Sequence, residues 1–389
     1  MKIALDAQLL LEEKKTGIGR TAKEIIDHMI QIPGNQYQLN YFYCRYSRKK
    51  QKQILKFYKE QGCILKGHSW LLGAIYRRVT KIIPIPYWWL FGKDSDITQF
   101  FNYEVPFGVR GKKSTIVHDM CYKAYPETVE LKTRQWLERE LEISCERADV
   151  IITDSNFSKI EIQKYLNVVQ EKIKVVYCGV DHHTYHQNLE EEKLQFVKEK
   201  YGIQKPYLLY LGTLEPRKNI LLILEVFQEV SKKNQEISLI IAGKKGWMYE
   251  SIFEKVKEYG ISDRVIFTDY VLEEEVPYLY YGAEIFLFPS IYEGFGLPIL
   301  EAMACGTPVI VSNQASLPEV GGKAVLYINI KDESAVEQMD EAIEKLLNNM
   351  MFYNEKKKLS EEQAKKFTWN KAAQKFIKTY QTLLVEDKK

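Results

Sequence analysis

The chain has 389 residues, of which 46% are hydrophobic and 28% are charged. This composition is typical of a globular protein and excludes the disordered and fibrous classes. The length exceeds what one ordinary core needs and suits about two domains of roughly 150 residues each. The six cysteines form no CxxC pair, so they predict reduced thiols in a cytoplasmic protein rather than a disulfide framework.

The formal net charge of +3 conceals an asymmetry between the two halves of the chain. Residues 1–180 hold 29 Lys and Arg against 20 Asp and Glu, whereas the remainder holds 26 against 32. Much of the excess lies in residues 41–113, with 15 basic and 4 acidic side chains. A one-sided basic field indicates an anionic partner, such as phospholipid or a phosphate-bearing acceptor. No nucleic-acid motif accompanies the charge, so we do not expect nucleic acid as a partner.

The sequence predicts neither a signal peptide nor a membrane span. Asp6 interrupts the first apolar run, which does not fit the layout of a signal peptide. No stretch approaches the ~20 uninterrupted apolar residues that a spanning helix needs.

The first half of the chain shows strand and helix patterns in an irregular alternation. A short strand at 3–5 leads through Thr16–Arg20 into a helix expected from about Thr21 to Met29. Further strands are expected at 39–43, 97–101, 115–118 and 150–153.

Residues 69–83 carry apolar side chains at positions 72, 75, 76, 79, 82 and 83, which predicts a helix with one apolar face. Trp70, Trp88 and Trp89 flank this face, and Arg77, Arg78 and Lys81 lie off it. Two interpretations stay open. The helix either lies on an anionic lipid surface or packs on the sheet of its own domain.

The second half alternates regularly between short β-branched or aromatic runs and amphipathic stretches. Strands are expected at 207–211, 238–242, 265–268, 285–288 and 308–311, and helices at 220–232, 250–259, 273–281 and 298–304. Such alternation with short loops indicates βαβ units and a parallel sheet covered on both faces. We therefore predict an α/β fold of two Rossmann-like domains, with a boundary near Gly179–Glu192. The helices that follow Phe367 are expected to pack back across that boundary.

The segment Ser290–Glu301 holds the strongest functional signal. An expected strand enters a glycine-containing loop, and a helix opens with Pro298 in its first turn. The amides of Phe295, Gly296 and Leu297, together with the positive end of the helix dipole, predict a cradle for an anion or a hydroxyl. Glu293 precedes the cradle and Glu301 follows it. The alternative is a helix start whose glycines and acids serve only its own stability.

The segment Gly212–Asn219 follows the strand at 207–211 directly. Ligands of open α/β sheets bind beyond the carboxyl ends of the strands, where this loop is expected. Arg217 and Lys218 can neutralise a departing diphosphate without a metal ion. Two cations at a helix start are otherwise disfavoured by the helix dipole, which favours a functional interpretation.

Gly212–Asn219 followed by Glu293–Glu301 resembles the donor site of the retaining GT-B glycosyltransferases of family 4, a group that includes bacterial mannosyltransferases. Glu293 and Glu301 match the EX7E pattern of that family, and Arg217 with Lys218 match its Arg-Lys pair. The resemblance extends over nearly the whole chain, through Thr16–Arg20, His118-Asp119, Asp154–Ser158 and Phe367–Trp369.

The resemblance implies a GT-B fold with a cleft between the domains. Residues 1–182 would form the acceptor-side domain, 183–366 the nucleotide-sugar-binding domain, and 367–389 a helix packing back towards the first domain. It implies roles for the following residues: Glu293 contacts the sugar, Glu301 the ribose, Arg217 and Lys218 the diphosphate, Phe295–Leu297 offer amides to the sugar, and 243–244 with 268–271 border the base.

Two residues of the first half receive roles from the same resemblance. His118 ends an expected strand, so it should project into the interdomain crevice beside the transferred sugar, although a lone histidine there is also compatible with a structural role. Gly17, with Gly19, would form the loop that closes over the diphosphate. The spacing Gly-Ile-Gly is not GxGxxG and by itself is a weak motif.

Two other patterns suggest a metal. Asp94-Ser-Asp96 has the DxD form of metal-dependent transferases but precedes an expected strand instead of ending one, so we interpret it as a solvated strand entry. His182, His183 and His186 have no carboxylate or thiol at motif spacing. We therefore expect no metal and no cofactor.

The sequence thus predicts a metal-independent, retaining glycosyltransferase. It would move a hexose from a nucleotide-diphosphate sugar, with GDP-mannose favoured, to a glycan or lipid-linked glycan acceptor in bacterial surface polysaccharide synthesis. The expected location is the cytoplasm, at the inner membrane face if the lipid interpretation of residues 69–83 holds. The alternatives are a sugar-nucleotide epimerase of similar fold and a non-catalytic partner that binds a nucleotide or glycan. The intact set of Arg217, Lys218, Glu293 and Glu301 argues against the last.

Overall fold

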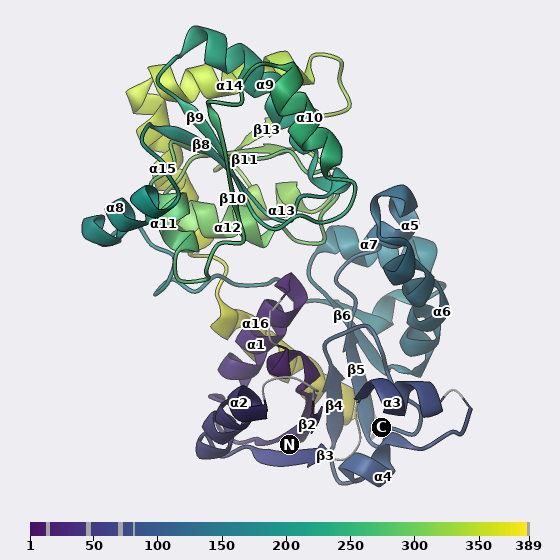
Figure 1. The fold of residues 1–389 in the computed structure, drawn as a ribbon. Coiled ribbons are helices and arrows are strands. Elements are labelled where there is room, and N and C mark those ends of the chain that lie inside the picture. The colour runs from purple at the N-terminus through teal and green to yellow at the C-terminus, as the bar shows by residue number, and fades with distance from the viewer. Residues whose placement is uncertain (13–15, 44–47, 69–72, 81, 387–389) are drawn as a thin grey trace. The chain divides into compact units, whose positions relative to one another are not determined.

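The computed structural model of the protein describes residues 1–12, 16–43, 48–68, 73–80 and 82–386, and the chain forms two compact units (Figure 1). Unit 1 comprises Met1–Tyr122, Leu131–Cys178 and Trp369–Lys389. Unit 2 comprises Lys123–Glu130 and Gly179–Thr368. Each unit is therefore assembled from segments that are distant in the sequence.

Unit 1 is built on a sheet of parallel strands. These are β1 (Lys2–Asp6), β2 (Gln36–Phe42), β3 (Ile64–His68), β4 (Ile97–Phe100), β5 (Lys112–Ile116), β6 (Val150–Thr153) and β7 (Ile173–Val175). Their order is β3-β2-β1-β4-β5-β6-β7, and every pair is parallel. The chain runs outward from β1 in one direction and from β4 in the other. The space beyond the carboxyl ends of β1 and β4 is therefore a topological switch point, where ligands of such sheets bind.

Helices cover the sheet of unit 1. They are α1 (Gly17–Met29), α2 (Arg48–Glu60), α3 (Gly73–Val79), α4 (Tyr87–Phe91), α5 (Cys121–Ala124, which continues into unit 2), α6 (Leu131–Arg147), α7 (Asn156–Tyr165) and α16 (Trp369–Glu386), with 3₁₀ turns η1 (Gln8–Leu11) and η3 (Gln170–Lys172). Two of them, α1 and α16, pack side by side (Figure 1). The Tyr380 hydroxyl on α16 donates to Gln99 Oε1 on β4 at 2.6 Å, which fixes the last helix to the sheet.

Unit 2 repeats this architecture. Its strands are β8 (Tyr207–Leu211), β9 (Ser238–Ala242), β10 (Val265–Asp269), β11 (Ile285–Phe288), β12 (Val309–Ser312) and β13 (Leu326–Ile328). The order is β10-β9-β8-β11-β12-β13, again with parallel pairs only. All residues of β9, β11 and β12 are buried, as expected of strands covered on both faces. The switch point of this sheet lies between β8 and β11.

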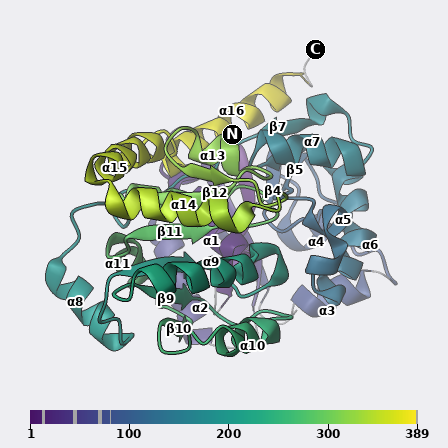
Figure 2. The same ribbon diagram turned by 90° about the horizontal axis from the view of Figure 1, so that it is seen from above.

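The helices of unit 2 form two layers, one on each face of its sheet (Figure 1), and Figure 2 looks down on one of these layers. They are α8 (Glu191–Lys200), α9 (Ile220–Lys233), α10 (Glu250–Glu258), α11 (Val276–Tyr281), α12 (Leu297–Ala304), α13 (Leu317–Gly321), α14 (Ala335–Asn348) and α15 (Met350–Ala364), with η2 (Pro126–Thr128) and η4 (Pro216–Lys218). One layer contains α9 with α10 and α14, and the other contains α12 with α11, α13 and α15. Among the described helices, none combines the length and the apolar composition that crossing a bilayer requires.

The predicted alternation of strands and helices is confirmed, with local differences. The strand expected at 115–118 is β5, which ends at Ile116, so His118 lies beyond it. Gly17 and Gly19 occupy the first turn of α1, because Thr16 caps the helix by accepting from the Gly19 amide at 3.3 Å. The prediction of a loop there was wrong. Of the helix expected at 69–83, the structure shows α3 at Gly73–Val79, and residues 69–72 and 81 lie outside the described residues.

Candidate functional site

The candidate donor site lies at the switch point of unit 2. Arg217 and Lys218 belong to η4, in the loop that follows β8. Glu293 lies in the loop that follows β11, and β11 is the hydrogen-bonded neighbour of β8. The Ile291 amide donates to the Arg217 carbonyl at 2.7 Å. This bond joins the two loops and sets the separation of their charged side chains.

The side chains at this point form one ionic cluster. Lys218 Nζ lies 2.5 Å from Glu293 Oε1, and Arg217 Nη1 lies 3.0 Å from Glu293 Oε2. Arg217 Nε also lies 2.5 Å from Glu215 Oε1. Lys218, Glu293 and Glu215 are only 6%, 7% and 5% exposed. Because buried charges are costly unless they are paired, each member of the cluster depends on the others.

The cluster determines the charge of its central carboxylate. Burial alone would raise the pKa of Glu293, but the positive charges of Lys218 and Arg217 lower it from 4.5 to about 2. Burial and the charge of Arg217 lower the pKa of Lys218, and the two nearby carboxylates oppose that effect. Glu293 is therefore ionised at neutral pH. It can accept hydrogen bonds from sugar hydroxyls or stabilise positive charge on a sugar ring, but it cannot donate a proton.

The loop after Glu293 turns sharply into α12. Gly296 is the N-cap of the helix, with φ of 107°, a conformation that favours glycine. A Cβ at this position would lie 2.8 Å from Leu317 Cδ2. The Ser316 hydroxyl donates to the carbonyls of Glu293 at 2.8 Å and Phe295 at 3.0 Å, which holds the loop in place. In the first turn of α12, Pro298 has no N–H and the Ile299 amide donates to the Gly296 carbonyl at 3.2 Å. The Leu297 amide has no acceptor within the helix and suits an anion or a hydroxyl.

Glu301 lies on α12 behind this loop. It is 5% exposed, and its Oε2 accepts from the Tyr280 hydroxyl at 3.2 Å. The structure therefore brings Arg217, Lys218 and Glu293 into direct contact and connects them to 295–297 through the loop. Glu301 is held separately by α11, the helix that carries Tyr280.

His118 and Asp154 form a second candidate cluster, in unit 1. His118 Nδ1 lies 2.6 Å from Asp154 Oδ2, and both residues are at most 8% exposed. Burial alone would lower the pKa of His118, but the charge and hydrogen bond of Asp154 raise it. A backbone contact with Phe101 also raises the pKa of His118, although the buried Nε2 makes no hydrogen bond of good geometry within the described part of the chain. A buried nitrogen of this kind is suited to a ligand atom, because leaving it unpaired is costly.

The remaining sequence candidates lie elsewhere. Gly17 is the exposed first residue of α1. Asp96 accepts from the Lys2 amide at 2.7 Å at the amino end of β4, away from the carboxyl ends of the strands. Among residues 1–12, 16–43, 48–68, 73–80 and 82–386, no group of three or more His, Cys, Asp or Glu side chains is arranged to hold a metal ion.

Sequence reasoning missed two members of these clusters, Glu215 and the pairing role of Asp154. Glu215 could have been found from its place in the loop, and Asp154 from strand adjacency. Glu215 precedes Arg217 in the same loop, and Asp154 directly follows β6, the parallel neighbour of β5. Parallel neighbours bring their carboxyl ends to one edge of the sheet, so the residues that follow β5 and β6 are expected to meet.

Two doubly wound parallel sheets, with a cationic pair and a carboxylate at the switch point of the second, define a GT-B glycosyltransferase. Two family models match the chain. "Glycosyltransferase Family 4" matches residues 17–184 and "Glycosyl transferases group 1" matches residues 191–367. The chain belongs to this family of glycosyltransferases, and it is an enzyme of that class.

Curated relatives belong to the same family. The chain is 34% identical to O-antigen chain mannosyltransferase B of Escherichia coli, over 72% of this chain and 73% of that protein. It is 32% identical to the serotype-specific mannosyltransferase WbdA of Escherichia coli, over 61% of this chain but only 29% of that longer protein.

Solved structures share the fold. HepE of Anabaena, in complex with UDP and glucose, superposes with a TM-score of 0.74 at 16% identity, covering 98% of this chain and 100% of HepE. WaaG, a glycosyltransferase involved in lipopolysaccharide biosynthesis, gives a TM-score of 0.68 at 15% identity, covering 96% of this chain and 98% of WaaG.

Proposed function

We propose that this enzyme transfers a mannosyl residue from a nucleotide-diphosphate sugar to a hydroxyl group of a glycan or lipid-linked glycan in bacterial surface polysaccharide synthesis. The observation that carries the proposal is the Arg217–Lys218–Glu293 cluster at the switch point of unit 2. The mannosyltransferase names of the relatives from Escherichia coli support the choice of sugar. GDP-mannose is the favoured donor. The UDP complex of HepE is the reason to test UDP sugars as well.

Each member of the cluster has a proposed task. Arg217 and Lys218 bind the diphosphate, and their fixed charges stabilise it as it leaves. Glu293 accepts hydrogen bonds from the sugar, since its low pKa keeps it ionised. The amides at Phe295, Gly296 and Leu297 bind sugar hydroxyls. Glu301 accepts from the ribose.

The reaction is proposed to retain the anomeric configuration. The bond between the anomeric carbon and the diphosphate oxygen breaks, and its electron pair leaves with the diphosphate. The acceptor oxygen bonds to the same face of the sugar, and its proton passes to the departing phosphate. No enzyme nucleophile is required. His118 is proposed to orient the sugar through Nε2, and Gly17 to bring the amino end of α1 to the diphosphate.

The enzyme is proposed to need no metal ion, because Arg217 and Lys218 supply the positive charge that a divalent cation would otherwise provide. Nucleotide release should then be unchanged by EDTA. If EDTA abolished nucleotide release, the enzyme would require a metal ion, and Asp94 and Asp96 would be the candidate ligands.

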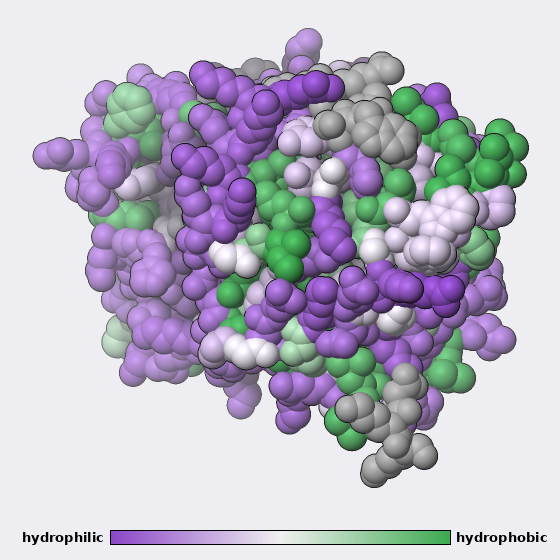
Figure 3. Space-filling view, turned by 90° about the horizontal axis from the view of Figure 1, so that it is seen from below, coloured by the Kyte–Doolittle hydropathy of each residue, from purple (hydrophilic) through white to green (hydrophobic). Residues whose placement is uncertain are grey.

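A surface of unit 1 is proposed to contact an anionic membrane. Apolar side chains gather around α3 and α4 (Figure 3), with Ile82 85%, Trp89 65% and Ile83 60% exposed. The backbone of Phe107, itself 49% exposed, accepts from the Tyr87 amide at 2.9 Å, which places Phe107 beside α4. Three exposed residues near these helices are basic: Arg78 lies on α3, Lys93 follows α4, and the Arg110 guanidinium lies 5.8 Å from the centroid of the Trp88 ring. Aromatic and apolar groups beside basic ones suit the interface of an anionic bilayer.

The decisive experiment measures nucleotide release from a panel of nucleotide sugars by purified enzyme, with Arg217→Ala as the test variant. Removing one partner of a buried charge pair typically costs ~2–5 kcal/mol. A cost of that size in the transition state corresponds to a loss of roughly thirtyfold to several thousandfold in rate. Arg139→Ala, an exposed arginine on α6, is the matched control. Activity of Arg217→Ala within threefold of wild type would refute the proposed role.

Product analysis distinguishes the remaining alternatives. Transfer with retention gives a glycoside with the anomeric configuration of the donor, which NMR coupling constants report. Interconversion of the nucleotide sugars without transfer would instead identify an epimerase.

A further inference from the structure

The connection between β5 and α6 leaves unit 1 and returns to it. β5 ends at Ile116 and α6 begins at Leu131, although a loop between a strand and the next helix commonly needs only ~2–6 residues. Within this connection, residues 123–130 belong to unit 2, whereas the residues on either side belong to unit 1. We call residues 123–130 the strap. Long connections on a rigid scaffold commonly carry a function of their own.

Hydrogen bonds within the strap give it a defined shape. Pro126 opens the 3₁₀ turn η2 and fixes its own φ there. The amide and the hydroxyl of Thr128 both donate to the Tyr125 carbonyl, at 3.0 Å and 2.8 Å. Thr128 is only 5% exposed. The strap is therefore an ordered turn that can hold two contacts at a fixed separation.

Two contacts attach the strap to the rest of unit 2. The Trp247 indole Nε1 donates to the Thr128 carbonyl at 2.9 Å. The rings of Tyr125 and Tyr292 lie with their centroids 5.7 Å apart and their planes at 60°. Tyr292 is 2% exposed, so the ring of Tyr125 packs against a residue of the unit-2 core. Aromatic pairs at this separation are attractive beyond the area that they bury.

The two contacts lie on loops at either side of the donor cluster. Trp247 follows β9 and Tyr292 follows β11, and β8 lies between these strands in the sheet. The loop after β8 carries the two cations of the cluster. It is bound to the loop after β9, because the Gly246 amide donates to the Leu214 carbonyl at 3.0 Å. The strap therefore connects the loops that surround the switch point of unit 2.

Tyr292 links the strap directly to the donor cluster. It precedes Glu293 in the chain, and its carbonyl accepts from Arg217 Nη1 at 3.0 Å. The same Nη1 lies 3.0 Å from Glu293 Oε2. A displacement of Tyr292 would therefore move the backbone that orients the guanidinium and the carboxylate together.

We propose that the strap completes the donor site of unit 2, with Tyr125 as a positioning residue that acts through Tyr292 on Arg217 and Glu293. The inference rests on the proposed donor binding, and it adds to that site a segment that both precedes and follows residues of unit 1. Tyr125 acts without touching the nucleotide sugar. Because a guanidinium binds phosphate oxygens with a specific geometry, a small displacement of Arg217 weakens binding of the diphosphate.

The test is a double-mutant cycle on nucleotide binding. Isothermal titration calorimetry measures the Kd of GDP, or of UDP if wild type binds UDP instead, for wild type, Tyr125→Ala, Arg217→Lys and the double variant. Lysine keeps the positive charge but loses the guanidinium contacts. Tyr125→Ala is expected to weaken binding about fivefold, the scale of one aromatic pair. In the Arg217→Lys background the same change should weaken binding less than about twofold, because effects that act through one residue are not additive.

Controls separate positioning from a general loss of stability. Tyr125→Phe keeps the ring and should bind as wild type does. Phe196→Ala removes a ring that is 61% exposed on α8 and should also leave the Kd unchanged. Wild-type affinity in the folded Tyr125→Ala variant, or an equal loss in both backgrounds, would overturn the proposal. If Tyr125→Ala does not fold, Trp247→Phe, which removes the N–H donor to Thr128, is carried through the same cycle and decides.

Failure of this inference can be told from failure of the proposed function. If wild type binds neither nucleotide, the donor assignment fails, and the inference fails with it. If wild type binds a nucleotide and Arg217→Lys weakens that binding while Tyr125→Ala does not, the donor site stands and only the role of the strap is rejected.

Discussion

Replacing Glu293→Gln removes the charge at the centre of the donor cluster while keeping the shape of the side chain. The pKa of Glu293 is lowered from 4.5 to about 2 by its contacts with Lys218 and Arg217. Since each pKa unit is worth ~1.4 kcal/mol, the ionised carboxylate contributes about 3 kcal/mol to the stability of unit 2 at pH 7. Because the pKa is lowered by folding, this contribution is complete above pH 4.5 and is lost as the pH falls towards 2.

The assay is urea unfolding followed by circular dichroism at several pH values between 7 and 2. At pH 7 the variant is expected to be less stable than wild type by about 3 kcal/mol, because the buried Lys218 and the partly buried Arg217 lose their shared partner. The difference should shrink as the pH falls below 4.5. Glu254→Gln, an exposed carboxylate on α10, controls for surface charge. Parallel pH profiles for wild type and Glu293→Gln would refute this account of the cluster.

Three further predictions concern the other clusters. Glu301→Gln should raise the KM for the nucleotide sugar several-fold with little change in kcat. This is expected because a ribose contact stabilises the bound substrate and the transition state equally. An unchanged KM would contradict a ribose contact. Asp154→Asn should lower the pKa of His118, which an NMR titration measures. In wild type, the contact of protonated His118 with Asp154 stabilises the fold at low pH and is lost as the pH rises through the raised pKa of His118, and the variant should lack this contribution. Trp89→Ser with Ile82→Ser should reduce co-sedimentation with vesicles that contain anionic lipid, measured against vesicles of neutral lipid; unchanged sedimentation would reject the membrane surface.

The fold was predictable where the sequence is periodic. In unit 2, strands such as Tyr207–Leu211 and Ile285–Phe288 are continuous apolar runs, and their bounds agree with the structure. In unit 1, β3 (Ile64–His68) was not predicted, because it is an edge strand in which only Ile64 and Leu65 are apolar. An edge strand pairs on one side only and is less buried, so it does not need the continuous run of apolar residues by which a buried strand is predicted.

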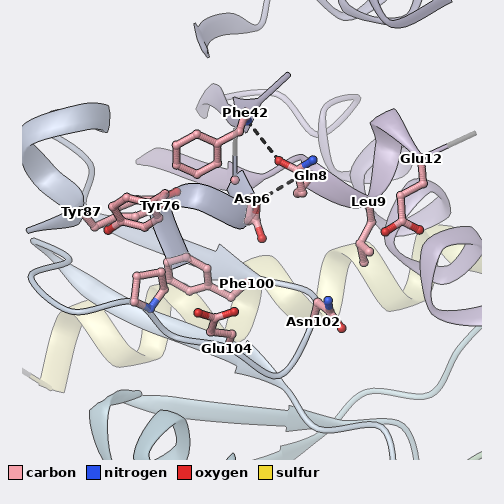
Figure 4. A pocket seen from close by; sticks show the side chains of 12 residues that line it. Asp6, Gln8, Leu9, Glu12, Phe42, Tyr76, Tyr87, Phe100, Asn102 and Glu104 are labelled. Atoms are coloured by element: carbon pink, nitrogen blue, oxygen red, sulfur yellow. Dashed lines mark hydrogen bonds between the residues drawn. The ribbon is translucent and has the colours of Figure 1, made fainter. Parts of the chain in front are cut away.

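The site was predictable in part for the same kind of reason. Arg217, Lys218 and Glu293 could be found because they lie in the loops that follow two apolar strands, β8 and β11, and the order of the strands brings these loops together. A cavity of about 240 Å³ at the ends of β1, β2 and β4 (Figure 4) was not predicted. Its lining residues Tyr76 and Tyr87 come from α3 and α4, and in a linear pattern an inward-facing tyrosine cannot be told from any other core aromatic.

The two units share one topology but place different side chains at its switch point. In both sheets the chain reverses direction beside the first strand, which leaves a space beyond the carboxyl ends that the helices do not cover. In unit 2 the loops at this point supply Arg217 and Lys218, whose charge suits a diphosphate. In unit 1 the equivalent point is lined by the carboxylates of Asp6 and Glu104 and by the aromatic rings of Tyr76, Tyr87 and Phe100.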